Sequence, residues 1–71
     1  MPNQTLTVYD LLMACPDDQV KRLQIAHRAV AAGDWKEASH SLRNAARDGN
    51  SDWHDQCAVL AVEFDAKADR S

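Results

Sequence analysis

The residues of this chain that could do chemistry are three histidines, two cysteines and one pair of adjacent aspartates. His54 and Cys57 lie three positions apart, so on a helix they would share one face and could ligate one metal ion. A structural zinc site needs four ligands and a catalytic one needs three. The other candidate ligands are isolated in the sequence: His27, His40 and Cys15. This favours packing of Cys57 in an apolar core, and we predict no metal and no cofactor.

Motifs of catalysis are not found in the sequence either. It contains no glycine-rich phosphate loop, no nucleophile elbow and no His-Glu-x-x-His pattern. Asp17 and Asp18 form a carboxylate pair, but they follow Pro16 at the expected start of a helix, where negative charge complements the helix dipole. His27 falls on the expected buried face of that helix, which favours a core histidine over a general base. We predict that the protein is not an enzyme.

Four basic side chains recur at spacings of four, three and four residues and form what we call the basic ridge: Lys36, His40, Arg43 and Arg47. On a helix they fall within a sector of about 60°. An ordinary solvated helix face is one interpretation. The other is a docking surface for an acidic partner. Because no aromatic residues interleave with the ridge and the net charge of the chain is −3, a protein partner is preferred and a nucleic acid is the alternative.

The helices that must position these residues can be read from caps and periodicity. Thr7 is the expected N-cap of a short first helix whose buried residues are Val8, Leu11, Leu12 and Tyr9. A second helix is expected from Pro16 to Gly33. Its apolar positions recur at spacings of three and four: Val20, Leu23, His27, Val30 and Ala31.

A third helix is expected from about Trp35 to Arg47. Gly33 suits the left-handed residue that ends a helix, and Asp34 can cap the next one with Glu37 completing a capping box. The expected inner face consists of Trp35, Ala38, Leu42, Ala45 and Ala46, which leaves Ser41 off it. Gly49 is expected to close this helix.

A fourth helix is expected after Ser51, with an apolar stripe of Trp53, Cys57, Leu60, Ala61 and Phe64. Val59 and Val62 point away from that stripe. Either the first helix covers this side or the two valines form a surface for self-association, giving a weak homodimer. Beyond Phe64 the chain turns polar, so residues 66–71, like residues 1–5, are expected to fray.

Residues 25–50 resemble a single tetratricopeptide repeat: a helix with small residues, then Gly-Asp-aromatic-x-x-Ala, then a second helix. Gly33, Asp34, Trp35 and Ala38 match that motif. The resemblance implies buried positions at Leu42 and Ala45 and small facing residues at Ala26 and Ala29. It departs from the family at Arg22, where the family has an aromatic residue, and at Asn50, where the family has a closing proline. It implies close helix packing and no catalytic residue, and a single unit must be capped by other helices.

Composition bounds the remaining possibilities. A chain of 71 residues with 45% hydrophobic content and only two glycines and two prolines suits one small helical domain, residues 1–71, of modest stability. Residues 21–47 are basic and both flanks are acidic, a layout typical of internal charge compensation. The sequence lacks a positively charged signal region and a stretch of membrane-spanning length, so we expect a cytoplasmic protein without a membrane partner. Reducing conditions favour free thiols, although pairing of Cys15 with Cys57 stays open.

The sequence therefore predicts an all-α bundle of three main helices and a short N-terminal one, built around a tetratricopeptide-like hairpin. The predicted function is a non-enzymatic protein–protein interaction module: an adaptor, a chaperone-like subunit or a small inhibitor acting by surface occlusion. On size alone, an inhibitor encoded by a phage or mobile element belongs to this class. The predicted partner-binding residues are those of the basic ridge. The alternative is a small nucleic-acid-associated regulator that uses the same ridge.

Overall fold

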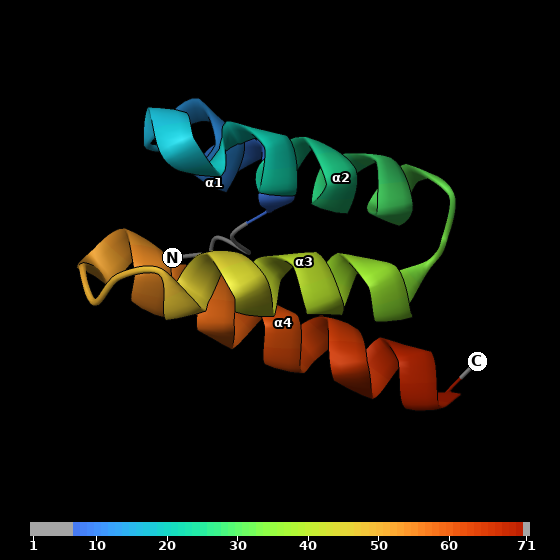
Figure 1. Cartoon of the computed structure of the whole chain (residues 1–71). Coiled ribbons are helices and arrows are strands. Elements are labelled where there is room, and N and C mark those ends of the chain that lie inside the picture. The colour runs from blue at the N-terminus through green and yellow to red at the C-terminus, as the bar shows by residue number, and fades with distance from the viewer. Residues whose placement is uncertain (1–6, 71) are drawn as a thin grey trace, which may run out of the picture.

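The computed structural model describes residues 7–70, which form four α-helices and one short 3₁₀ turn (Figure 1). The helices are α1 (Val8–Met13), α2 (Val20–Ala31), α3 (Trp35–Arg47) and α4 (Asp52–Arg70), and the 3₁₀ turn η1 spans Asp17–Gln19. Within this range there is no strand. The predicted all-α bundle of three main helices and a short N-terminal one is confirmed, whereas the fraying expected for residues 1–5 lies outside the described residues.

The first helix begins at the predicted cap. The hydroxyl oxygen of Thr7 accepts a hydrogen bond from the backbone N–H of Asp10 at 3.2 Å, and the Asp10 carboxylate accepts one from the Thr7 N–H at 3.1 Å. This reciprocal arrangement satisfies two backbone donors that a helix start otherwise leaves without a partner.

The turn between α2 and α3 forms at the predicted residues, but Glu37 does not complete the predicted capping box, because the Asp34 N–H donates to a backbone carbonyl of α2 instead. Gly33 has a φ of 74°, and the Asp34 N–H donates to the Ala29 carbonyl at 2.8 Å while the Gly33 N–H donates to the Val30 carbonyl at 3.0 Å. These two bonds are the Schellman closure of a helix. The Asp34 carboxylate then accepts from the Glu37 N–H at 3.2 Å. Three residues separate α2 from α3, and only one of them, Gly33, is in the left-handed conformation.

Helices α2, α3 and α4 run side by side in alternating directions, with α3 in contact with both neighbours (Figure 1). The molecule is flat, with extents of 32 × 31 × 18 Å. The short α1 contacts α2 and α4. The indole N–H of Trp53, at the start of α4, donates to the Leu11 carbonyl at 2.9 Å and ties α1 down.

The core is built mainly from leucines and small residues. Its buried members are Val8, Leu11, Leu23, Ala26, Ala29, Ala38, Leu42, Ala45, Cys57, Leu60, Ala61 and Phe64. Buried alanines on both α2 and α3 let these two helices approach closely, since no larger side chain separates their backbones. The predicted stripe of α4 is confirmed, with Trp53 half-buried at its edge.

The predicted buried face of α2 is wrong in part. His27 is exposed, and its ring lies 6.4 Å from that of Tyr9, which is also exposed rather than buried. The face toward the core carries Leu23, Ala26 and Ala29 instead. An imidazole is too large for a contact that close packing against α3 reserves for alanine, so the helix is turned to place its small residues there.

The second helix also differs from expectation at its edges. Val20 and Val30 are only half-buried and Ala31 is exposed. In α1, Leu12 is half-buried while Val8 and Leu11 are buried as predicted. Spacing at three and four residues predicts one buried face that includes Val20, Val30 and Ala31, and the structure places these three at its edge or outside it.

Two predictions about α3 and α4 are corrected. Ser41 is buried on α3, where the sequence placed it off the inner face. Residues 66–70, expected to fray, continue α4 to Arg70. The ammonium group of Lys67 lies 4.7 Å from the centre of the Trp35 ring, so this part of α4 still contacts α3.

Gly49 follows α3 but does not end it in the left-handed conformation that the sequence predicts. Of the two glycines, only Gly33 has a positive φ. The role of Gly49 is spatial. A Cβ atom at Gly49 would lie within 3.0 Å of three atoms of the His54 ring. The glycine therefore makes room for the imidazole, whose Nδ1 lies 2.7 Å from the hydroxyl of Ser51 at the start of α4.

Candidate protein-interaction surface

All four residues of the basic ridge are exposed on α3, as the sequence predicts. The opposite side of the helix carries its buried residues Ala38, Leu42 and Ala45. The cap at Asp34 holds the start of this helix, and Arg47 lies in its last turn, where a cation complements the negative end of the helix dipole. The ridge is thus a straight row of side chains on a well-anchored helix.

One member of the ridge is already engaged within the fold. The guanidinium of Arg43 forms an ion pair with the carboxylate of Asp65 on α4, and the other oxygen of that carboxylate accepts a hydrogen bond from the Ser39 hydroxyl. Both charged side chains stay partly exposed, at 45% and 43%. Arg43 therefore joins α3 to α4 and differs in kind from Lys36, His40 and Arg47.

Val59 and Val62 are exposed on α4, at 63% and 61%. The alternative that α1 covers them is wrong. Trp53 contacts α1, and Val62 lies nine residues further along α4, which is half a turn away around the helix axis. The two valines therefore remain a surface feature, as the self-association interpretation requires.

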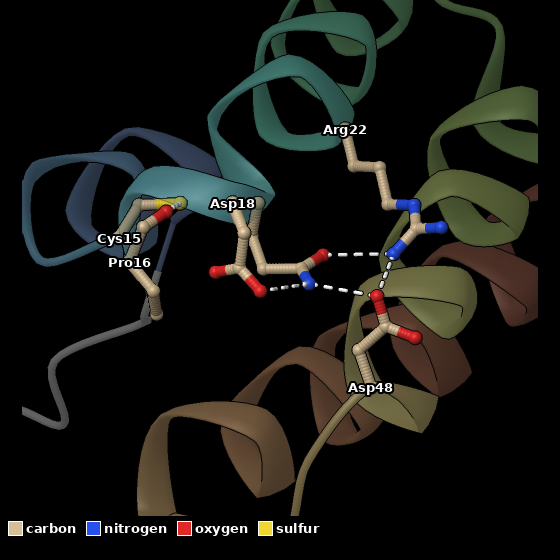
Figure 2. A network of polar contacts seen from close by, with 6 residues as sticks. Cys15, Pro16, Asp18, Arg22 and Asp48 are labelled. Atoms are coloured by element: carbon tan, nitrogen blue, oxygen red, sulfur yellow. Dashed lines mark hydrogen bonds and ion pairs between the residues drawn. The ribbon is translucent and has the colours of Figure 1, made fainter.

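A polar cluster that the sequence did not reveal links the start of α2 to the end of α3 (Figure 2). Gln19 is only 1% exposed; its amide donates to the Asp48 carboxylate at 2.8 Å and its carbonyl accepts from Arg22 at 3.0 Å. Arg22 also forms an ion pair with Asp48. The hydrogen bond from Gln19, followed by that from Arg22, lowers the pKa of Asp48 below its ordinary value of 3.8.

This cluster has a structural explanation. Each buried polar atom of Gln19 has a partner, and in residues 7–70 no buried side-chain nitrogen or oxygen lacks one. Two signals could have pointed to it. The glutamine sits within an acidic stretch at a helix start, and Asp48 follows directly after α3. Neither signal specifies that they meet, because 29 residues separate them in the sequence.

The two cysteines are free thiols. Burial, with a smaller contribution from Cys15, raises the pKa of the Cys57 thiol to about 12. Burial, together with Asp18 and Asp17, also raises the pKa of Cys15. Both thiols are therefore protonated at neutral pH, and Cys57 packs in the core as the sequence predicts.

The candidate metal ligands do not converge. His54 lies beside Ser51 and makes an edge contact with Trp53 at 5.0 Å between ring centres. Cys57 is buried among core residues. Within residues 7–70, no three histidine, cysteine, aspartate or glutamate side chains form a set that could hold a metal ion.

An apolar pocket of about 180 Å³ opens on the side of the molecule where α1 lies. Val8 of α1 and Val30 of α2 line it together with Trp35, Phe64 and Lys67. The two aromatic rings are 5.5 Å apart, and the Lys67 ammonium covers them. The basic ridge is on another face of α3 and does not contribute to this pocket.

None of the helices in the described part of the chain is long and apolar enough to cross a membrane. Comparison of the chain with models of protein families, with curated proteins and with solved structures finds no match.

Proposed function

We propose that this chain is a non-enzymatic protein-binding module whose basic ridge contacts an acidic surface of another protein. An adaptor, a chaperone-like subunit or a small inhibitor that occludes its target would all act in this way. One observation carries the proposal: three cationic or titratable side chains of the ridge, Lys36, His40 and Arg47, are exposed in a row on a rigid helix. Such a row is suited to a partner whose charge is opposite and similarly spaced.

The same proposal includes a tetratricopeptide-like packing of α2 on α3. Support comes from the positions that the resemblance implied. Ala26, Ala29, Ala38, Leu42 and Ala45 are all buried, and Gly33 has the left-handed conformation. We also propose a cytoplasmic location, since both cysteines are free thiols, as is usual in a reducing compartment.

The test uses paired charge reversals. The ridge variant carries Lys36→Glu and Arg47→Glu, and leaves Arg43 unchanged because reversing it would place two negative charges together at Asp65. The matched control carries Lys21→Glu and Arg28→Glu on α2, both exposed. Each pair alters the net charge equally and places one substitution in the first turn and one in the last turn of its helix.

Affinity capture from a lysate of the source organism, followed by mass spectrometry, provides the measurement. The ridge variant should lose a partner that wild type and control retain, with circular dichroism spectra unchanged in all three. Equal capture by ridge variant and control would refute the proposal. Retention of duplex DNA that falls steeply between 50 and 200 mM salt would instead support the nucleic-acid alternative.

A further inference from the structure

The basic ridge and the exposed side of α4 belong to one continuous outer face. The ion pair between Arg43 and Asp65 lies at the seam between the two helices. On α4, Ala58 and Val62 lie before Asp65 and Asp69 lies after it; all three are exposed and on the side away from Trp53 and α1. Figure 1 shows α3 and α4 side by side along their whole common length. The face is thus basic along α3 and apolar to acidic along α4.

The contacts of Asp65 also set the register of these antiparallel helices. Asp65 contacts the short side chain of Ser39, and Trp35, one turn earlier on α3, contacts Phe64 and Lys67, so this turn of α3 lies level with residues 64–67 of α4. Moving toward the start of α3 corresponds to moving toward the end of α4 at the same rise per residue. Lys36 is therefore level with Ala66, about one turn before Asp69, and Arg47 is level with Asp55, about one turn before Val59. Because helical side chains lean toward the N-terminus of their own helix, those of Lys36 and Arg47 extend toward Asp69 and Val59.

We propose that a second copy of this chain binds this outer face, related by a two-fold axis that runs parallel to the helices. This inference rests on the proposed use of the basic ridge as a contact surface and names an occupant for it. Rotation about such an axis keeps every residue at its level and exchanges the two helices. The α3 helix of each copy then lies across the α4 helix of the other, forming a four-helix arrangement with an isologous interface.

Charge complementarity selects this axis. It brings the side chain of Lys36 of one copy to the level of Asp69 of the other, and the side chain of Glu37 to the level of the other copy's Arg70, and the two-fold repeats each pairing. All four of these side chains are exposed. A two-fold axis perpendicular to the helices would instead stack one basic ridge on the other, and like charges at an interface are repulsive.

The centre of the proposed interface is apolar and small. The aliphatic part of the Arg47 side chain can cover Val59 and Val62, and Ala58 permits close approach of the helix from the second copy. The area is limited by α3, whose 13 residues span about 20 Å. A face of this length and two helices wide buries about 400 Å² per copy, below the usual size of a stable interface, so the dimer is weak and forms at high concentration.

The test exploits the symmetry of the interface. Lys36→Glu and Asp69→Lys are made as separate variants of the full chain. Each substitution places a charge that complements the dipole of its own helix terminus, so neither should harm folding. Alone, each variant brings two pairs of like charges together. Mixed in equal amounts, the two variants restore opposite charges at both symmetry-related positions. Lys21→Glu, in the first turn of α2, is the matched control.

Sedimentation equilibrium up to about 1 mM protein, at low salt, measures the association. Wild type and Lys21→Glu should form dimers with the same constant, each interface variant alone should associate at least about tenfold more weakly, and the mixture should recover the wild-type constant. A monomeric wild type at 1 mM, equal association of all variants, or species larger than a dimer would each overturn the proposal. If only self-association fails while ridge-dependent capture persists, the dimer alone is wrong and the proposed function stands.

Discussion

Gln19 illustrates how much a single buried polar side chain can organise. Its carboxamide occupies the gap between α2 and the end of α3 and gives a partner to Asp48 on one side and to Arg22 on the other. A buried amide that lost either partner would incur a desolvation cost, so the cluster favours one spacing of these helix ends. Its effect on Asp48 makes this organisation measurable as a dependence of stability on pH.

Replacing Asp48 with Asn should change the response of the protein to acid. A carboxyl group whose pKa is lowered by folding stabilises the folded state above its ordinary pKa of 3.8, and that contribution is lost as the pH falls from there through the lower folded pKa. Wild type should therefore be more stable than Asp48→Asn at pH 6, and the difference should shrink by pH 3. Urea unfolding at both pH values measures it.

The control for this prediction is Glu63→Gln, which removes the same charge from an exposed side chain of α4. A gap between wild type and Asp48→Asn that is equal at both pH values would show that the hydrogen bonds of the cluster do not favour the ionised carboxylate.

At the scale of the helices, the contact between α2 and α3 depends on small side chains. Ala38 is fully buried at that contact, and Leu42 is fully buried one turn further along. Replacing Ala38 with Leu should overpack the contact and cost about 1–3 kcal/mol. Leu42→Ala should leave a cavity and cost about 2–5 kcal/mol. Thermal melts of the three proteins check both values.

Gln24→Ala on the exposed side of α2 is the control, because replacing an exposed side chain should leave the melting temperature unchanged. Ser41, which the sequence placed off the inner face of α3, does not serve as a control because it is buried. A melting temperature for Ala38→Leu equal to that of wild type would mean that the helices are not held at close approach by this residue.

The boundaries of the helices were predictable to a degree that the faces were not. Local chemistry sets the boundaries: Thr7 with Asp10, and Gly33 with Asp34, make hydrogen bonds within a few residues of themselves. Which side of α2 is buried depends instead on what lies opposite, and spacing alone does not distinguish Ala26 and Ala29 from His27. The basic ridge was predictable because a row on one helix is a local property.

The pairing of Arg43 with Asp65 could not be predicted from the sequence, since the two residues lie 22 positions apart on different helices and meet only if the register of those helices is known. The same holds for Gln19 and Asp48. Long-range polar contacts are therefore the part of the candidate surface that needed the structure, and they decide which members of the ridge are available to a partner.

For the whole molecule, the proposed dimer predicts a stability that depends on concentration. Association of folded chains raises the melting temperature once the protein concentration approaches the dissociation constant, because unfolded chains do not form the interface. Wild type should melt at higher temperature at 1 mM than at 10 μM. Lys36→Glu should melt at one temperature throughout. Differential scanning calorimetry across this range checks the prediction, and a constant wild-type melting temperature would contradict it.

The hydrogen bond from Trp53 to Leu11 has a consequence for observing how the molecule opens. Trp53 lies at the end of α4 where α1 is attached, whereas Trp35 lies beneath Lys67 near the other end. Since α1 is six residues long, it is the helix most readily detached. Replacing either indole with phenylalanine leaves a single tryptophan, whose emission is excited selectively at wavelengths that Tyr9 does not absorb. The emission of Trp53 then reports detachment of α1 and that of Trp35 reports separation of α3 from α4, so intrinsic fluorescence can resolve the order of these two events without an added label.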